Sequence, residues 1–368
     1  MAGNLLLRFP YAFLTAISHG LGLRLDTTTA LLGIRELGGL ASPAIGAVAD
    51  RGHERRAMVT CAVLAGISTV AIAGHPALWL VTILLIIGGI AKFGSDTAQT
   101  AWIGHRVPFE QRGRIFGVVE LSWAFAFIAG VPVCAWLEGH WGWQAMFIFS
   151  GGFLMVSGLA TRFVVPADQP EQVEKGRRPR LSGPLVGMYA YVALQPFAQM
   201  FVFAVYGDWF VKHLHMSNAR LGLSTLLIGI GEGVGTVLTA LVADRLGPRR
   251  SAIAGMLLAA PLALLLGAVG GHVWFGVALL VVMSAGVEFS FVSALPIITE
   301  LDPGARAAAI GLATVVITVA RAASSAISGY VYVHAGIAVT GIVGAVAFGL
   351  AAFALWTVVE PSERAPQL

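Results

Sequence analysis

Ionisable side chains lie inside long apolar stretches of this sequence, where a charge is expensive. Lys92 and Asp96 fall in the apolar run 78–101, and Glu232 and Glu288 fall in two later runs. A charged residue at the centre of a bilayer costs about 3 kcal/mol on insertion scales, so such residues face a bundle interior or a water-filled path and mark routes for solutes, ions or protons. These residues are therefore candidates for binding a solute or carrying protons.

The spacing of these candidates indicates their chemistry. Lys92 and Asp96 are four residues apart, so in a helix they share a face and can form an ion pair. The alternative to a solute or proton site is an internal salt bridge that holds helices together. Glu120 and Glu232 have no obvious local cation, and a buried carboxyl group without one tends to take up a proton. With Asp96 and Glu288 they are candidates for proton coupling, and the alternative is a neutral carboxylic acid hydrogen-bonded to a neighbouring helix.

Two further charges lie near the ends of apolar runs. Arg8 belongs to the short run 4–22, which Pro10 interrupts, and Asp208 lies near the end of the run 185–211. Charged side chains close to a membrane surface extend toward water, so we expect both to reach the interface.

The composition is that of a membrane protein. The 368 residues are 57% hydrophobic and only 11% charged, whereas a soluble domain carries about 25% charged residues. The net charge of +4 could indicate a nucleic-acid partner. The arginines, however, lie in short loops between apolar runs, which is the pattern of cytoplasmic loops in membrane proteins. We expect membrane lipid as a partner and no nucleic acid.

The apolar runs are long enough to cross a bilayer, which takes about 20 residues each. They lie near 4–22, 29–50, 57–74, 78–101, 114–137, 143–165, 185–211, 218–243, 251–270, 273–298, 307–330 and 336–358. A polar and basic stretch separates the first six from the last six. We expect a six-helix bundle at 1–165, a cytoplasmic basic linker at 166–184, a second bundle at 185–358 and a cytoplasmic tail at 359–368.

Positive charge is distributed unevenly over the loops. If both termini are cytoplasmic, sixteen Lys and Arg residues fall in the inner loops and ends, against three in the outer loops, Arg24, Lys212 and Arg220. Because cytoplasmic loops carry the excess of basic residues, the sequence predicts a multi-pass protein of the cytoplasmic membrane with both termini cytoplasmic.

A charged loop occurs twice in the chain. Val48-Ala49-Asp50-Arg51, followed by Arg55-Arg56, returns 194 residues later as Val242-Ala243-Asp244-Arg245, followed by Arg249-Arg250. A second pair of loops, around Pro108 and Pro303, has an offset of 195 residues. Two landmarks at nearly one spacing predict a tandem duplication, and parallel repeats of this kind are a plan of membrane transporters.

These loops resemble the signature of the major facilitator superfamily, which reads roughly Gly-x-x-x-Asp-Arg-x-Gly-Arg-Arg between that family's second and third helices. The matching residues are Gly46, Asp50, Arg51 and Arg55 in the first copy and Asp244, Arg245 and Arg249 in the second. The first copy departs from the pattern at Gly52, which stands one place early, and at Glu54, where a base is usual. The resemblance, to bacterial efflux permeases in particular, implies an all-α polytopic membrane fold of about 12 transmembrane helices in two pseudo-symmetric six-helix bundles.

In that family the first, fourth, seventh and tenth spans line a central cavity, so the resemblance places Lys92, Asp96 and Glu288 where solute or protons could reach them. It also implies gates. Glu36 and Arg321 would pair across the bundle boundary when the outer side is closed, and on the inner side the N-terminus of the eleventh span would hold the Asp50 carboxylate. The other signature residues would complete the gating loops, namely Gly46, Arg51, Arg55, Asp244, Arg245 and Arg249.

Taken together, these features predict a secondary active transporter that moves a small organic solute by alternating access, with protons as the expected coupling ion. Efflux is the expected direction, by analogy with the family's exporters. The segment Gly130-Val131-Pro132 resembles a shortened Gly-Pro motif of the superfamily's antiporters, and the alternative reading is a proline kink. The alternative functions are uptake of a nutrient or sugar by a carrier of the same fold, and a non-transporting membrane sensor or assembly partner.

The sequence contains no constellation typical of an enzyme. It has no phosphate-binding loop and no nucleophile with a base at a recognisable spacing. His213 and His215 lack the acidic or cysteine companions of a metal site. We therefore expect no enzymatic activity, no cofactor and no bound metal, and a monomer whose partners are the solute, the coupling ion and lipid.

Overall fold

The computed structural model describes residues 1–74, 77–107, 115, 118–119, 121–168, 182–301 and 306–357. Over these ranges the chain is helical, with short turns and no strand. The all-α fold expected from the sequence is confirmed.

The chain forms two compact units. The first comprises Met1–Glu174 and Tyr206–Leu226, and the second comprises Lys175–Val205 and Leu227–Leu368. The predicted bundle 185–358 includes 206–226, whereas this segment is grouped here with the first unit. The division into two bundles, a linker and a tail stays a prediction.

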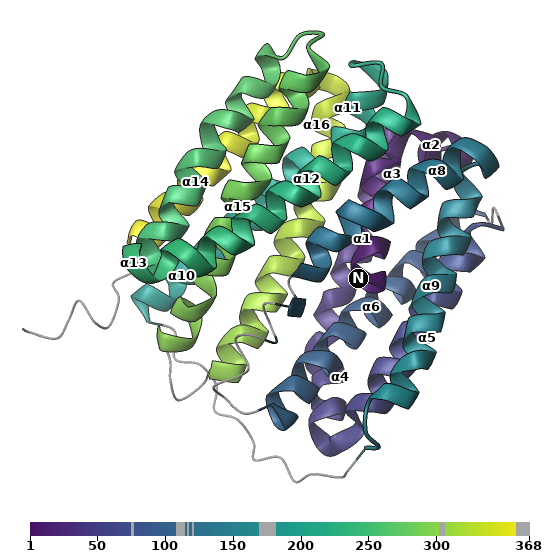
Figure 1. The fold of residues 1–368 in the computed structure, drawn as a ribbon, viewed down its shortest axis with the longest axis vertical. Coiled ribbons are helices and arrows are strands. Elements are labelled where there is room, and N and C mark those ends of the chain that lie inside the picture. The colour runs from purple at the N-terminus through teal and green to yellow at the C-terminus, as the bar shows by residue number, and fades with distance from the viewer. Residues whose placement is uncertain are drawn as a thin grey trace, which may run out of the picture. The chain divides into compact units, whose positions relative to one another are not determined.

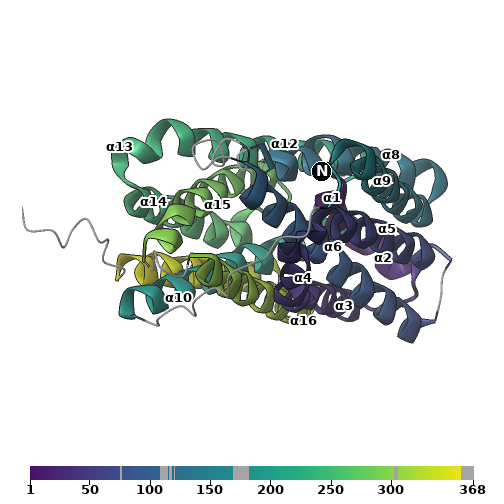
Figure 2. The same ribbon diagram turned by 90° about the horizontal axis from the view of Figure 1, so that it is seen from below.

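The first unit is a bundle of helices in which α5 packs against both α6 and α9 (Figures 1 and 2). Its elements are α1 (Ala2–Ala12), α2 (Leu14–Gly20), α3 (Leu25–Glu36), η1 (Leu37–Ala41), α4 (Ser42–Val48), η2 (Ala49–His53), α5 (Glu54–Ile72), α6 (Leu78–Arg106), η3 (Ala126–Gly130), α8 (Val131–Trp141), α9 (Trp143–Val164), α11 (Tyr206–Lys212) and the start of α12 (Asn218–Leu238).

In the second unit α10 packs along α16, and α14 packs against α15 and α16 (Figure 1). Its elements are α10 (Gly183–Phe203), the rest of α12, η4 (Thr239–Ala243), α13 (Asp244–Leu246), α14 (Pro248–Leu264), η5 (Leu265–Ala268), α15 (Val273–Leu301) and α16 (Arg306–Trp356).

Nine helical stretches within the described ranges are long and apolar enough to cross a membrane. Two of them, Leu25–Ile72 and Ala309–Trp356, have 48 residues each. A straight helix of that length would measure about 72 Å, more than twice the ~30 Å thickness of the hydrocarbon core. Each is interrupted at a glycine, Gly52 with φ 81° and Gly336 with φ 76°, so each supplies two crossings. The polytopic membrane fold is confirmed, and the count of twelve crossings stays a prediction.

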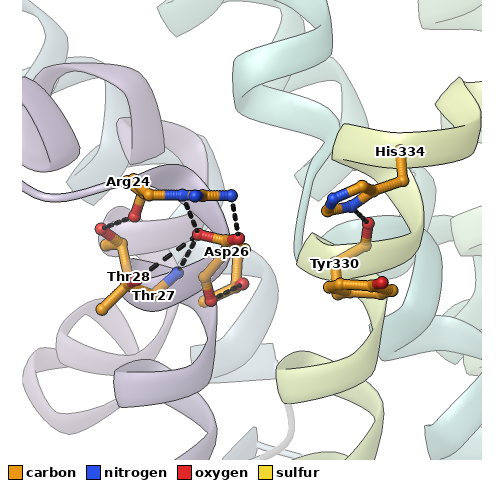
Figure 3. A network of polar contacts seen from close by, with 7 residues as sticks. Arg24, Asp26, Thr27, Thr28, Tyr330 and His334 are labelled. Carbon is orange, nitrogen blue, oxygen red and sulfur yellow. Dashed lines mark hydrogen bonds and ion pairs between the residues drawn. The ribbon is translucent and has the colours of Figure 1, made fainter.

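The duplication extends to backbone conformations. Gly142 (φ 80°, ψ 179°) precedes α9, and Gly336 (φ 76°, ψ −179°), 194 residues later, interrupts α16. His140 and His334, which are also 194 residues apart, each donate from Nδ1 to the carbonyl oxygen four residues earlier, at 2.7 Å and 2.8 Å. Figure 3 shows the second copy, in which the imidazole lies 4.1 Å from the ring centre of Tyr330. Unusual geometry repeated at the offset of the charged loops supports a tandem origin for the two units.

A proline in the first helix frees a carbonyl group that another helix must bind. Pro10 of α1 has no N–H for the carbonyl of Leu6, four residues earlier. In hydrocarbon such a carbonyl needs a donor, and Arg35 of α3 supplies it. Its Nη1 donates to Leu6 O at 3.0 Å, and its Nη2 donates to Leu7 O at 3.2 Å and to Glu36 Oε1 at 3.0 Å. The buried guanidinium therefore fixes α3 on α1 beside the proline.

The first turn of α3 is held by a separate polar network near the end of the bundle. Arg24 pairs with Asp26 at 2.9 Å, and the Asp26 carboxylate accepts the Thr27 N–H at 2.8 Å (Figure 3). A carboxylate is stabilising at a helix N-terminus. The Arg24 side chain is 73% exposed, so this arginine serves as a control for substitutions of buried ones.

We expect Gly142→Ala and Gly336→Ala each to destabilise the protein by about 1–3 kcal/mol, because a backbone with φ near +80° and ψ near 180° is accessible essentially to glycine alone. Gly152→Ala in α9 is the matched control, since a methyl group there meets no atom within 4 Å. Alanine in place of a helical glycine should stabilise by about 0.5–1 kcal/mol. Thermal unfolding of the purified protein in detergent measures these differences, and equal stability of all three variants would contradict the assignment.

We expect Arg35→Gln to lower the free energy of unfolding by about 3–5 kcal/mol, the usual cost of removing one partner of a buried ion pair. In a Pro10→Ala background the loss should be smaller, because the restored N–H at position 10 can bind the Leu6 carbonyl. A double-mutant cycle measures this coupling, with Arg24→Gln as the exposed control. An equal loss in both backgrounds would show that Arg35 does not replace the missing N–H.

Candidate functional site

A cluster of cationic and aromatic side chains lies in the first unit. Arg8 comes from α1, Lys92 from α6 and Trp123 from the helical stretch Leu121–Trp141. Arg8 Cζ lies 5.1 Å, and Lys92 Nζ lies 4.6 Å, from the centre of the Trp123 ring. Both distances are within the range of cation–π attraction. We name these three side chains the Arg8–Trp123–Lys92 cluster.

Neighbouring residues one helical turn away extend this cluster. Phe127, four residues after Trp123, lies 4.4 Å from Arg8 Cζ, measured to the ring centre. Asn4, four residues before Arg8, donates from Nδ2 to Ser122 Oγ at 2.9 Å. Residues four apart share a helix face, so α1 and the stretch Leu121–Trp141 meet along a face that combines aromatic, cationic and hydrogen-bonding groups.

Lys92 forms an ion pair with Asp96, as their spacing predicts. The two partners differ in access to the surroundings, because the Lys92 side chain is 1% exposed and that of Asp96 is 45% exposed. Gly3 of α1 borders the pair, and a methyl group at that position would lie 3.5 Å from Lys92 Cε. The ammonium group is thus buried, while the carboxylate that neutralises it is accessible. The role of the pair in solute or proton movement stays a prediction.

Two predicted carboxyl groups of the second unit lie where α12 and α15 cross. Thr236 of α12 donates to Glu288 Oε1 at 3.4 Å and to the backbone carbonyl of Glu232 at 3.2 Å. Glu232 is 1% exposed. The crossing is close, because a methyl group at Gly235 would lie 2.4 Å from Ala285 O, so only glycine fits there. The part of these carboxyl groups in proton movement stays a prediction, and Glu120 lies outside the described residues.

The two signature loops turn through a glycine in the left-handed region. Gly52 has φ 81° and Gly247 has φ 86°, a conformation that glycine adopts without steric cost. The glycine that stands one place early in the first loop therefore performs the same turn as its counterpart. Gly46, one turn before Asp50, packs against α6, where a methyl group would lie 3.2 Å from Thr97 Cγ2.

Glu54, the residue that departs from the family pattern, is buried and binds a histidine. Its Oε1 lies 2.8 Å from His105 Nδ1, and Asp50 Oδ1 lies 3.8 Å from Nε2 of the same ring. His105 is in the last turn of α6, so one imidazole contacts two carboxylates of the first signature loop. Sequence reasoning did not identify His105. The available signal was the acidic residue at position 54, which requires a donor once it is buried.

Asp168 holds the basic end of the same loop. Its carboxylate accepts the backbone N–H of Arg55 at 2.8 Å and that of Arg56 at 3.3 Å, and it pairs with Arg56 Nε at 3.4 Å. These N–H groups belong to the first turn of α5, where no carbonyl of the helix can accept them and a negative charge is stabilising. Arg51 of the loop is exposed. Asp168 was also missed, because it falls in the stretch predicted to be a linker.

The second signature loop is tied to the end of the last helix. Arg249 donates from Nε to Leu355 O at 3.2 Å and from Nη2 to Trp356 O. These are the final carbonyl groups of α16, where a cation is stabilising. Arg245 is exposed, and the side chain of Asp244 lies outside the described residues. The gating roles of both loops stay predictions.

Glu36, the residue predicted for the outer gate, is completely buried. It accepts a hydrogen bond from Arg35, its neighbour in sequence. Arg321, its predicted partner, lies in α16 of the second unit, and pairing between the two stays a prediction.

The expectation that Asp208 extends to water is wrong. Its side chain is buried, accepts a hydrogen bond from Thr15 Oγ1 at 2.6 Å and pairs with Lys212 Nζ at 3.0 Å. Burial is tolerated because two donors compensate the carboxylate. Arg8 does not follow the expectation either, since its guanidinium lies over aromatic rings of the Arg8–Trp123–Lys92 cluster and its Nε is buried.

Comparison with known proteins places the chain among membrane transporters. The family model described as Major Facilitator Superfamily matches residues 5–211 and 188–368. A gentisate transporter of Corynebacterium glutamicum is 23% identical over 233 residues, which are 57% of this chain and 51% of that protein. An uncharacterized MFS-type transporter of Bacillus subtilis, YwfA, is 25% identical over 175 residues, which are 45% of this chain and 42% of that protein. The chain thus spans about half the length of the curated relatives it matches.

The two matches to the family model run between them from residue 5 to the last residue. The helices long and apolar enough to cross a membrane agree with that assignment. This chain therefore belongs to the Major Facilitator Superfamily of membrane transporters.

Proposed function

We propose that this chain is a secondary active transporter that couples a small organic solute to protons. It works as a monomer in the cytoplasmic membrane, with both termini cytoplasmic, and alternates between inward-open and outward-open states. Membership of the family supports transport. The observation that carries the coupling is the Lys92–Asp96 pair, in which a buried ammonium is neutralised by an accessible carboxylate.

A proton on Asp96 changes what Lys92 can bind. The neutral carboxylic acid no longer compensates the ammonium, so Lys92 becomes available to another anion. A negatively charged solute then binds together with the proton, whereas a positively charged solute competes with the proton for Asp96. Each ligand drives the cycle only through its preference for one of the two states, so the charge of the solute decides whether transport is symport or antiport.

Uptake by symport is the first candidate direction. The Arg8–Trp123–Lys92 cluster places two cationic side chains on one aromatic ring, which favours an anionic solute. A relative bears the name gentisate transporter, and gentisate is an aromatic carboxylate. A solute of that charge class would move inward with protons along their gradient.

Proton-driven efflux, the direction expected from the sequence, is the second candidate. The antiporter-like segment that begins at Gly130 packs directly on α1, because a methyl group at Gly130 would lie 2.7 Å from Leu5 Cδ1. Substitution there would force these two helices apart, as expected if their close contact belongs to an exchange mechanism. Glu232 and Glu288 are further candidates for carrying the exchanged proton.

Transport by the purified protein in proteoliposomes tests this proposal. We expect counterflow of at least one labelled compound from a panel of carboxylates, neutral molecules and amines that includes gentisate, and accumulation of that compound under an imposed pH gradient. Accumulation on the alkaline side indicates symport, and accumulation on the acidic side indicates antiport. Accumulation that ignores the pH gradient would contradict proton coupling. Absence of counterflow for the whole panel would favour a sensor or assembly role.

We expect Asp96→Asn to lower accumulation driven by the pH gradient by about tenfold or more while counterflow persists, because coupling free energies between sites are about 1–3 kcal/mol. The control is Glu300→Gln, which neutralises an exposed carboxylate near the end of α15 and should leave accumulation unchanged. If Asp96→Asn accumulates solute like the unmodified protein, the proton is carried elsewhere. Glu232→Gln and Glu288→Gln in the same assay identify the group.

A further inference from the structure

We infer that the Arg8–Trp123–Lys92 cluster binds the carboxylate group of a small organic anion. This inference rests on the transport function proposed above and names the chemical class of its solute. All three side chains belong to the first unit, so the binding element is contained in one compact part of the chain.

The first argument is the arrangement of positive charge. Arg8 Cζ and Lys92 Nζ lie 5.1 Å and 4.6 Å from the centre of one Trp123 ring, so the two charges are no farther apart than the sum of those distances. Charges at such separations interact strongly where water is scarce. The ring face attracts each cation and holds both in place. An anion near both groups gains from two attractions, whereas a cationic solute meets two repulsions.

The second argument is that Asp96 already shows how a carboxylate binds here. It is a singly charged carboxylate, it pairs with Lys92, and it lies on the accessible side of a fully buried ammonium. A solute that approaches from that side reaches Lys92 at the position Asp96 occupies. When Asp96 takes up a proton, the solute carboxylate can replace it and the local charge is unchanged. The ligand therefore resembles Asp96 in charge and head group.

The third argument concerns the groups around the head group. A guanidinium presents parallel N–H donors to a carboxylate, which makes Arg8 suited to a two-point contact. Phe127 lies over this guanidinium, 4.4 Å from Cζ to the ring centre, and leaves the edge with the N–H groups as the direction for a ligand. Phe93, whose ring centre lies 5.2 Å from Lys92 Nζ, adds apolar surface. A carboxylate with an aromatic or aliphatic body fits these surroundings better than a sugar.

Binding of radiolabelled benzoate to the purified full-length protein tests the inference, with benzamide as the neutral competitor of the same shape. We expect saturable benzoate binding that other monocarboxylates displace and benzamide does not. Arg8→Gln and Lys92→Gln should each weaken binding by about tenfold or more, because a charge-assisted contact is lost. Arg8→Lys, which keeps the charge without the planar donors, should give an intermediate loss. Arg24→Gln, at an exposed arginine, should bind like the unmodified protein.

Asp96→Asn keeps the test decisive even if a cluster variant fails to fold. Removing the competing carboxylate should tighten benzoate binding several-fold, whereas a merely structural ion pair predicts weaker binding or none. Equal displacement by benzamide, unchanged binding in Arg8→Gln and Lys92→Gln, or no benzoate binding by the unmodified protein would each overturn the inference. Transport of a neutral compound that ignores Arg8→Gln would overturn it while leaving proton-coupled transport intact. Saturable benzoate binding without counterflow of any compound would instead contradict the transport function.

Discussion

A charge in the hydrocarbon needs a partner, and this constraint determines much of the polar structure of the chain. Arg35 of α3 reaches two carbonyl groups of α1 that lie 28 and 29 residues earlier. Asp208 of α11 accepts from Thr15 of α2, 193 residues away. These contacts join segments that are distant in sequence, because the neighbouring turns of the same helix do not supply enough donors. The need to compensate charge therefore helps decide which helices are neighbours, and close packing at glycines completes the arrangement.

The duplication supplies the frame, and substitutions within it supply the chemistry. The turn glycines and the helix-capping histidines recur at an offset of 194 residues, whereas Lys92 and Asp96 correspond to Gly286 and Ser290. A methyl group at Gly286 would lie 3.0 Å from a carbonyl oxygen of α14, and Ser290 donates to another carbonyl of α14 at 2.7 Å. Positions that hold an ion pair in the first unit serve helix packing in the second. The second unit instead carries Glu288 between them, so the two related units present different charges.

The sequence predicted what depends on local spacing and on hydrophobic length. It indicated the all-α membrane fold, the repeated charged loops and the Lys92–Asp96 pair, since each follows from helical period, span length or motif. It did not predict Trp123 beside Lys92 or His105 beside Glu54, because both contacts join different helices and neither aromatic residue belongs to a pattern. It misplaced Asp208, because proximity to a span end was taken to mean access to water. Its donors, Thr15 above all, come from parts of the chain that only the fold brings near.

Comparison of two buried ion pairs separates a structural role from a functional one. In the Arg35–Glu36 pair both side chains are almost completely buried, at 2% and 0% exposed, and the guanidinium also binds two carbonyl groups. No proton or solute reaches that pair without separating helices. The Lys92–Asp96 pair has equal burial of its cation but leaves 45% of the carboxylate side chain exposed. Separating Lys92 from Asp96 requires only that another group replace an accessible partner, which a proton and an anionic solute can do together. Accessibility of the counter-ion, more than burial of the charge, therefore identifies the site at which this transporter can exchange ligands.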